Sequence, residues 1–246
     1  MAFLNKMTIP IKVVDIYDKA LFERLDQSIM EQFNAREHKD GIQQHLNLLD
    51  EKKEKGAGAD PLSRTDGGNE IKEIARREMV QYCEDLGADK KFVYQKLNST
   101  TGISWWNVLE RKEDWYPMHD HRNWFVSAVL YVNVNPNHQP TRFKSPLAGL
   151  MDSWFRPASR FFGEGTDSLQ EFDYFGASGH LLIFPPWLDH SVPPIMPNDI
   201  ASVLENSKLP GLKGKLPVRR NISNSTILVD DNKEKESPRV TIAFNF

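Results

Sequence analysis

A chain of 246 residues is long enough to bury one sizeable core, and 11% aromatic residues are too many for a disordered chain. The formal net charge of −3 gives no support to a general electrostatic grip on nucleic acid or on an anionic membrane. A single cysteine excludes an internal disulfide, no apolar run reaches transmembrane length, and the first residues lack the apolar core of a signal peptide. We therefore expect a cytoplasmic protein without a membrane segment.

Two apolar stripes at helical spacing predict two helices in residues 1–100. The first helix follows Asp18, a residue type that caps helix N-termini, and the second runs from Asn69 to just before Gly87. Their apolar positions are Leu21, Phe22, Leu25, Ile29 and Phe33 in the first, and Ile71, Ile74, Ala75, Met79, Cys83 and Leu86 in the second. The stripe predicts that Cys83 is a small buried hydrophobe, not a nucleophile. The polar segment 51–68 is expected to be an exposed mobile loop.

From about Gly102 onwards, short apolar and aromatic runs alternate with Pro, Gly and Asn. Four of these runs predict strands, at residues 103–109, 124–134, 180–184 and 239–246. Strands at this density after two helices predict helices packed on a β-sandwich or β-barrel. We expect one domain over residues 1–246, with a helical part at 1–100, a β core at 101–246 and a polar surface insertion at about 196–238.

Three of the seven histidines lie in short motifs just before or just after predicted strands. His119 and His121 precede the strand at 124–134, and His190 follows the apolar run that ends at residue 184. Side chains at positions i and i+2 of a strand point to one face, so the first two histidines could direct their ring nitrogens to one point. A third imidazole from a distant strand could then close one face of an octahedral metal site. Two histidines and a carboxylate, with open positions, form the metal site of non-haem Fe(II) oxygenases. The other four histidines are given no role: His38, His45 and His138, which are expected to be exposed, and His180.

A closed structural zinc site is a competing interpretation of these histidines, but such sites usually draw on cysteines, and Cys83 lies in the helical part. Five aromatic residues lie close to the histidine motifs, and we expect most of them to pack in the core: Trp105, Trp106, Trp124, Phe125 and Trp187.

Four segments occur in a fixed order along residues 104–246. They are Trp106-Asn107, His119-Asp120-His121 with the run 127–132, the run GHLLIFPPWLDHSV at 179–192, and the run RVTIAFN at 239–245. Together they resemble the 2-oxoglutarate/Fe(II)-dependent oxygenase superfamily, in its prolyl-hydroxylase-like subgroup from marine bacteria and their phages. The resemblance implies a mainly β fold, a double-stranded β-helix (a cupin-like jelly roll) backed by the N-terminal helices. It implies Fe(II) and 2-oxoglutarate as cofactors, and oxidative decarboxylation of 2-oxoglutarate by O2 coupled to hydroxylation of a substrate.

The resemblance also implies roles for particular residues. It implies that the metal ligands are His119, His121 and His190. It implies that 2-oxoglutarate is held by Arg239, which would grip the distal carboxylate, and by Thr241, Tyr131 and Asn107. A guanidinium group can donate two parallel hydrogen bonds to a carboxylate, which suits a buried anion. Packing within a strand remains an equally good interpretation of Tyr131.

The chain departs from the family motif at position 121, where the family usually has Asp or Glu. We expect His121 to be the second ligand, because adjacent residues of a regular strand face opposite sides and would turn Asp120 away. Asp120 stays open as the alternative if the backbone bends there. A second departure is the long separation between His190 and Arg239, which requires the insertion to loop out.

Two other functions compete with this interpretation. A three-histidine metal oxygenase without 2-oxoglutarate would not need Arg239 or Thr241. A non-catalytic β-helix binding domain is disfavoured because all three histidines are present. The sequence does not distinguish a peptide, a small molecule or a nucleobase as substrate, and it is compatible with a homodimer.

Overall fold

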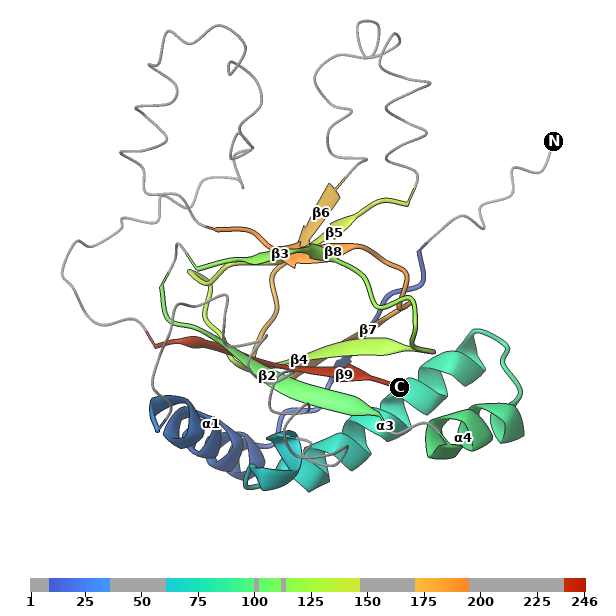
Figure 1. Cartoon of the computed structure of the whole chain (residues 1–246), viewed down its shortest axis with the longest axis horizontal. Coiled ribbons are helices and arrows are strands. Elements are labelled where there is room, and N and C mark those ends of the chain that lie inside the picture. Colours follow the sequence, from blue (N-terminus) through green and yellow to red (C-terminus); the bar gives the residue numbers. More distant parts are fainter. Residues whose placement is uncertain (1–8, 36–60, 100–101, 112–113, 147–170, 195–236) are drawn as a thin grey trace, which may run out of the picture.

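Two antiparallel β-sheets face each other, and helices cover the outer side of the larger sheet (Figure 1). The computed structural model describes residues 9–35, 61–99, 102–111, 114–146, 171–194 and 237–246. Its helices are α1 (Lys19–Asn34), α3 (Gly68–Asp85) and α4 (Lys90–Ser99), with the short 3₁₀ helix η1 (Pro61–Arg64) before α3. None of the described helices has the length and apolar character needed to cross a membrane.

The chain passes back and forth between the two sheets. The larger sheet contains β1 (Lys12–Asp15), β2 (Ile103–Leu109), β4 (Ser127–Asn133), β7 (His180–Phe184) and β9 (Arg239–Asn245), in the order β1-β7-β4-β9-β2. The smaller sheet contains β3 (Tyr116–His119), β5 (Thr141–Lys144), β6 (Glu171–Tyr174) and β8 (His190–Val192), in the order β3-β8-β5-β6. Because strands consecutive in sequence often lie in different sheets, residues far apart in the chain meet between them.

All four predicted strands are present, at or near the expected residues. β2 and β7 have the predicted bounds, β9 ends at Asn245, and β4 begins at Ser127, later than expected. The structure adds β1, β3, β5, β6 and β8, which have only three or four residues each. Strands this short carry too few residues to show an alternating pattern, which explains why the sequence did not indicate them.

Both predicted helices are present, and their apolar stripes pack against the larger sheet in one core. The Asp18 side chain accepts a hydrogen bond from the Leu21 N–H at 2.9 Å, as expected of an N-cap. Gly87 follows the end of α3 with φ 89°, the left-handed conformation that favours glycine. Leu86 was wrongly placed in the stripe, because α3 ends before it and its side chain is 56% exposed. Helix α4 was not predicted.

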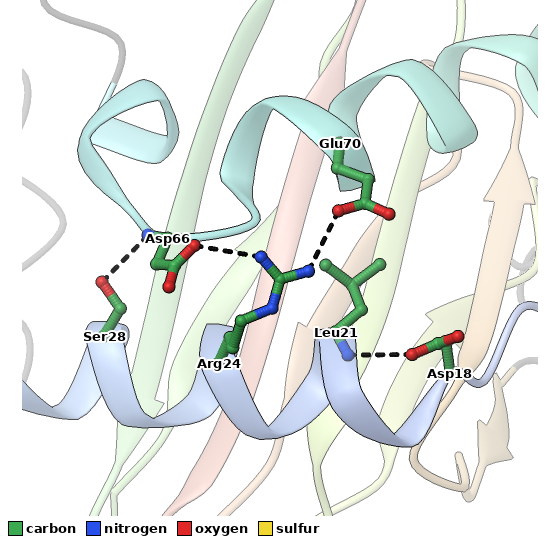
Figure 2. A network of polar contacts seen from close by, with 6 residues as sticks. All are labelled: Asp18, Leu21, Arg24, Ser28, Asp66 and Glu70. Atoms are coloured by element: carbon green, nitrogen blue, oxygen red, sulfur yellow. Dashed lines mark hydrogen bonds and ion pairs between the residues drawn. The ribbon is translucent and has the colours of Figure 1, made fainter.

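The expectation of a mobile loop over 51–68 is wrong for its second half, while 51–60 lie outside the described residues. Leu62 of η1 is fully buried in the helix-facing core. Figure 2 shows how α1 contacts the segment between η1 and α3. Arg24 of α1 forms ion pairs with Asp66 at 3.2 Å and with Glu70 in the first turn of α3 at 3.1 Å. Exposed ion pairs of this kind stabilise weakly, so the buried Leu62 is the stronger anchor.

Cys83 is buried in the helix-facing core, and burial raises the pKa of its thiol to about 11. The prediction of an unreactive packed cysteine agrees with this. The single-domain boundaries stay a prediction, and the insertion predicted at 196–238 lies outside the described residues except for its last two positions.

Strand β9 determines which side chains enter the space between the sheets. Every one of its residues is buried, so both of its faces are covered. Val240, Ile242 and Phe244 belong to the core shared with the helices. By strand alternation, the opposite face points toward the smaller sheet. This inner face carries Arg239, Thr241, Ala243 and Asn245.

Candidate metal centre

Three histidines gather at the edge of the smaller sheet. His119 ends β3 and is directly opposite His190, the first residue of β8. His121 lies in the turn after β3, and its backbone N–H donates to the Pro186 carbonyl at 2.7 Å, which ties this turn to the segment leading to β8. One ring nitrogen from each histidine lies within 4.8 Å of those of the other two. The three predicted ligands are therefore brought together.

His121 lies in the cluster as expected, but the reason that the sequence suggested, strand alternation, is wrong. Strand β3 ends at His119, so strand alternation does not orient His121. A turn directs it to the cluster instead. Asp120 turns toward Arg122, whose guanidinium lies 2.6 Å from the carboxylate. Among the described residues the cluster contains three histidines and no carboxylate. Their role as metal ligands stays a prediction.

Burial favours the neutral form of His119 and His190, and their hydrogen bonds orient both rings for metal binding. His119 Nδ1 donates to the Pro117 carbonyl at 2.8 Å, and His190 Nδ1 donates to the Leu188 carbonyl at 2.9 Å. With the proton on Nδ1, each Nε2 keeps a lone pair for a metal ion. His190 is 5% exposed, and burial, followed by the nearby His119, lowers its pKa to about 3. Burial also lowers the pKa of His119.

The donor set fits a first-row transition metal. Neutral imidazoles suit iron, nickel, copper and zinc, and a cluster without thiolates is not a typical closed zinc site. Nitrogens on one face of a metal, each about 2.1 Å from it, are about 3 Å apart, so the rings would need to move inward slightly. The outward edge of the cluster, from β3 and its turn, is only half-buried, which leaves room for further ligands.

A second polar group lies on the inner face, at the other end of β9. The Arg239 side chain is 2% exposed. Its Nε donates to the Gln139 carbonyl at 3.1 Å, and its Nη2 donates to Thr141 Oγ1 at 3.2 Å. The guanidinium carbon lies 5.5 Å from the centre of the Tyr131 ring, which supplies a cation–π contact. Among the described residues no carboxylate pairs with Arg239, so this part of the chain gives its buried positive charge no opposite charge.

The other predicted cosubstrate residues form a row beside Arg239. Thr241 is directly opposite Asn107 of β2 on one side and Tyr131 of β4 on the other. Directly paired residues point to the same face, so all three share the inner face. The Tyr131 hydroxyl bonds Thr141 Oγ1 at 2.5 Å, and burial raises the pKa of Tyr131 to about 12. The hydroxyl is therefore protonated at neutral pH and can donate a hydrogen bond.

Phe143 of β5 connects the histidine cluster with the arginine group. It is directly opposite His190, and its ring lies 6.0 Å from the imidazole. Thr141, which holds Arg239, is two residues earlier on the same strand, a distance of about 6.6 Å. Strand β5 therefore contacts both groups, through Phe143 at His190 and through Thr141 at Arg239.

Sequence reasoning missed several residues of this site, among them Gln139 and Thr141. Both contact Arg239 across about 100 positions of sequence, and no local pattern indicates such contacts. The expectation that His138 is exposed is wrong: its ring is 9% exposed, and its Nε2 donates to the Ser237 carbonyl at 2.8 Å. His38 and His45 lie outside the described residues.

Of the five aromatic residues near the motifs, fewer pack in the core than expected. Trp105 and Trp106 are buried, and Trp105 contacts the His121 ring at 5.9 Å. Phe125 and Trp187 are exposed, close in sequence to the histidines, and Trp124 is half-buried.

Residues 104–200 match a protein-family model described as "Putative 2OG-Fe(II) oxygenase". These residues therefore belong to a 2OG-Fe(II) oxygenase. The matched segment contains all three clustered histidines, and the family assigns Fe(II) and 2-oxoglutarate to this enzyme as cofactors. The marine and phage subgroup stays a prediction. No curated protein matches the oxygenase at a significant level.

Two solved structures resemble the oxygenase at low scores. A prolyl-4-hydroxylase from Pseudomonas putida is 12% identical with a TM-score of 0.42, and the match covers 97% of this chain and 88% of the other. HygX from Streptomyces hygroscopicus, solved with nickel and 2-oxoglutarate bound, is 10% identical with a TM-score of 0.44, over 97% and 82% of the two chains. The family assignment therefore rests on the sequence match of residues 104–200.

Proposed function

We propose that the oxygenase holds one Fe(II) through His119, His121 and His190 and binds 2-oxoglutarate through Arg239 and Thr241. It then couples oxidative decarboxylation of 2-oxoglutarate to hydroxylation of a substrate. The observation that carries this proposal is the buried Arg239. It has no carboxylate partner among the described residues, and it bonds Thr141 on β5, the strand that also contacts His190. An unpaired buried charge is costly, so an anionic ligand is the natural complement of this site.

The hydrogen bonds of Arg239 determine how it would receive a carboxylate. Nε and Nη2 are directed by Gln139 and Thr141, which fixes the plane of the guanidinium group. Among the described residues none accepts a hydrogen bond from Nη1, which leaves this group able to donate to the ligand. Thr241 and Tyr131 add hydroxyl groups on the same face. The resulting set of donors suits one buried carboxylate.

Histidines bind metal ions as neutral imidazoles, so a metal ion bound by these three would keep its full double charge. This charge attracts the second carboxylate of 2-oxoglutarate at the opposite end of the same space. When bound, the Fe(II) and 2-oxoglutarate supply the oxidation chemistry, with release of succinate and CO2. The contribution of the chain is to bind and orient these groups and, with Phe143 and Phe184 around His190, to exclude water from one side.

We also propose that the two sheets are the halves of a double-stranded β-helix. The repeated passage of the chain between sheets supports this, since successive strands of such a fold belong alternately to its two halves. The cytoplasmic location, the homodimer and the class of substrate stay predictions.

A three-histidine oxygenase that does not use 2-oxoglutarate is the second candidate. One observation favours it: among the described residues, the cluster contains no carboxylate. It leaves Arg239 unexplained, because such an enzyme needs no buried cation beside the metal.

We expect the purified protein, supplied with Fe(II), ascorbate and O2, to convert 2-oxoglutarate into succinate slowly even without its substrate. The reason is that the site for both cofactors is formed by the chain itself. Succinate can be quantified by mass spectrometry, with a metal chelator in the matched control. Failure to form succinate above that control would count against the proposal.

We expect His121→Ala to weaken metal binding on the order of tenfold or more, and Asp120→Ala to leave it unchanged. His121 lies in the cluster, whereas the Asp120 carboxylate faces Arg122. Titration of each variant with Ni(II) by calorimetry measures the difference. The reverse order of effects would make Asp120 the ligand.

A further inference from the structure

His121 differs from the other two histidines in the group that faces its Nδ1. The rings of His119 and His190 each bond a backbone carbonyl two residues earlier in the chain. His121 Nδ1 instead lies 3.4 Å from the side-chain amide nitrogen of Asn245, on β9. The distant strand β9 thus reaches the ring of a residue in the turn after β3.

The Asn245 amide is itself held by a second buried residue. Its Oδ1 accepts a hydrogen bond from the Ser127 hydroxyl at 2.6 Å. Ser127 and Asn245 are directly opposite each other on β4 and β9, and each side chain is 1% exposed. Buried polar side chains are retained at such positions when they make specific hydrogen bonds, so this pair fixes where the amide points.

The orientation of this amide determines which nitrogen of His121 can bind a metal ion. If the amide NH2 faces Nδ1, the ring proton must be on Nε2, and Nε2 has no lone pair for a metal. If the amide oxygen faces Nδ1, then Nδ1–H donates to it and Nε2 is free. The Ser127 hydroxyl is compatible with both orientations, since it can donate to the oxygen or accept from the NH2.

We propose that Asn245, held by Ser127, is a positioning residue that selects the metal-binding tautomer of His121. In the metal-bound protein the amide is turned over relative to this structure, so that the Asn245 oxygen accepts from His121 Nδ1–H and the Ser127 hydroxyl accepts from the amide NH2. This inference rests on the proposed function, because it requires His121 to be a ligand. It adds a role for two residues on β4 and β9, each more than 100 positions from its hydrogen-bond partner.

The neutrality of Asn245 has a consequence of its own. A carboxylate at this position would also accept from Nδ1–H and would hold His121 equally well, but it would add a negative charge beside the metal. Binding of the anionic 2-oxoglutarate would then be weakened. An amide orients the ring and leaves the positive charge of the site intact, so metal affinity and 2-oxoglutarate affinity respond differently to a change from Asn to Asp.

The test compares Ni(II) affinity, measured by calorimetry, in the full-length wild type and in Asn245→Leu, Asn245→Asp and Ser127→Ala. We expect Asn245→Leu to weaken affinity by about 10–100-fold, as for other residues that orient metal-bound histidines, and Ser127→Ala to weaken it less. Asn245→Asp should keep the Ni(II) affinity while weakening 2-oxoglutarate binding to the nickel-loaded protein. Asn133→Leu is the matched control: it removes another amide, bonded to Asp26 at 3.1 Å, without touching the cluster.

A spectroscopic readout separates positioning from general destabilisation. In the Co(II)-loaded protein, each Nδ1–H of a ligating histidine gives a shifted exchangeable proton resonance. The resonance of His121 should be lost or exchange faster in Asn245→Leu, while the other two remain. A folded Asn245→Leu with wild-type affinity and three unchanged resonances would overturn the inference.

The outcomes also distinguish this inference from the proposed function. If the wild type binds no Ni(II), or if His121→Ala binds it as well as the wild type, the proposed function fails and the inference with it. If His121→Ala loses Ni(II) affinity but the Asn245 and Ser127 variants keep that of the wild type, the inference is wrong and the proposed function stands. Should Asn245→Leu not fold, Asn245→Asp decides: unchanged 2-oxoglutarate affinity would contradict the role given to the amide.

Discussion

His190→Ala should leave the purified protein with little tightly bound metal, whereas the wild type should bind one Ni(II) or Fe(II) per chain. His190 is the most buried member of the cluster, and its Nδ1 is fixed by the Leu188 carbonyl. Loss of one ligand from a set of three should weaken binding by about 100-fold or more, beyond the effect expected for residues outside the ligand set. Elemental analysis after dialysis, together with calorimetric titration, measures both stoichiometry and affinity.

The matched control is His180→Ala, another histidine on a strand. His180 opens β7, is half-buried and bonds the Tyr174 hydroxyl at 2.7 Å, but it is not part of the cluster. This variant should keep the wild-type metal content. Wild-type metal content in His190→Ala would remove the histidine cluster as the metal centre.

Arg239→Leu should abolish detectable binding of 2-oxoglutarate while leaving the metal in place. The guanidinium group is fully buried and would be the partner of a buried carboxylate. Breaking a buried charge pair typically costs about 3–5 kcal/mol, which corresponds to a loss of affinity of at least two orders of magnitude. The visible charge-transfer band of the Fe(II) and 2-oxoglutarate complex, followed without O2, reports the binding directly.

Two further variants make this test specific. Arg239→Lys should restore binding only in part, because an ammonium group cannot reproduce the planar arrangement of donors. Arg142→Leu is the matched control, since Arg142 on β5 pairs with Asp173 at 2.7 Å and lies outside the Arg239 group. If the wild type shows no band at millimolar 2-oxoglutarate, or if Arg239→Leu binds it unchanged, the three-histidine oxygenase without 2-oxoglutarate becomes the better hypothesis.

The sequence by itself determined those elements whose signal is local. The stripe from Leu21 to Phe33 and the apolar runs of β2, β7 and β9 repeat at the period of their own structure, so each can be recognised without its neighbours. The candidate site residues followed from residue type and motif order. His119, His121 and His190 do meet, and Arg239 is buried next to Thr141 on β5, the strand that also contacts His190.

Only the tertiary structure decided how these residues are arranged. The short strands β3, β5, β6 and β8 have no period of their own and exist because neighbouring strands pair with them. His121 reaches the cluster from a turn anchored on Pro186, not from the strand that the sequence suggested. The contacts of Asn245 with His121 and of Arg239 with Thr141 join residues about 100 positions apart or more. Such contacts depend on how the two sheets face each other, and no local pattern in the chain encodes that arrangement.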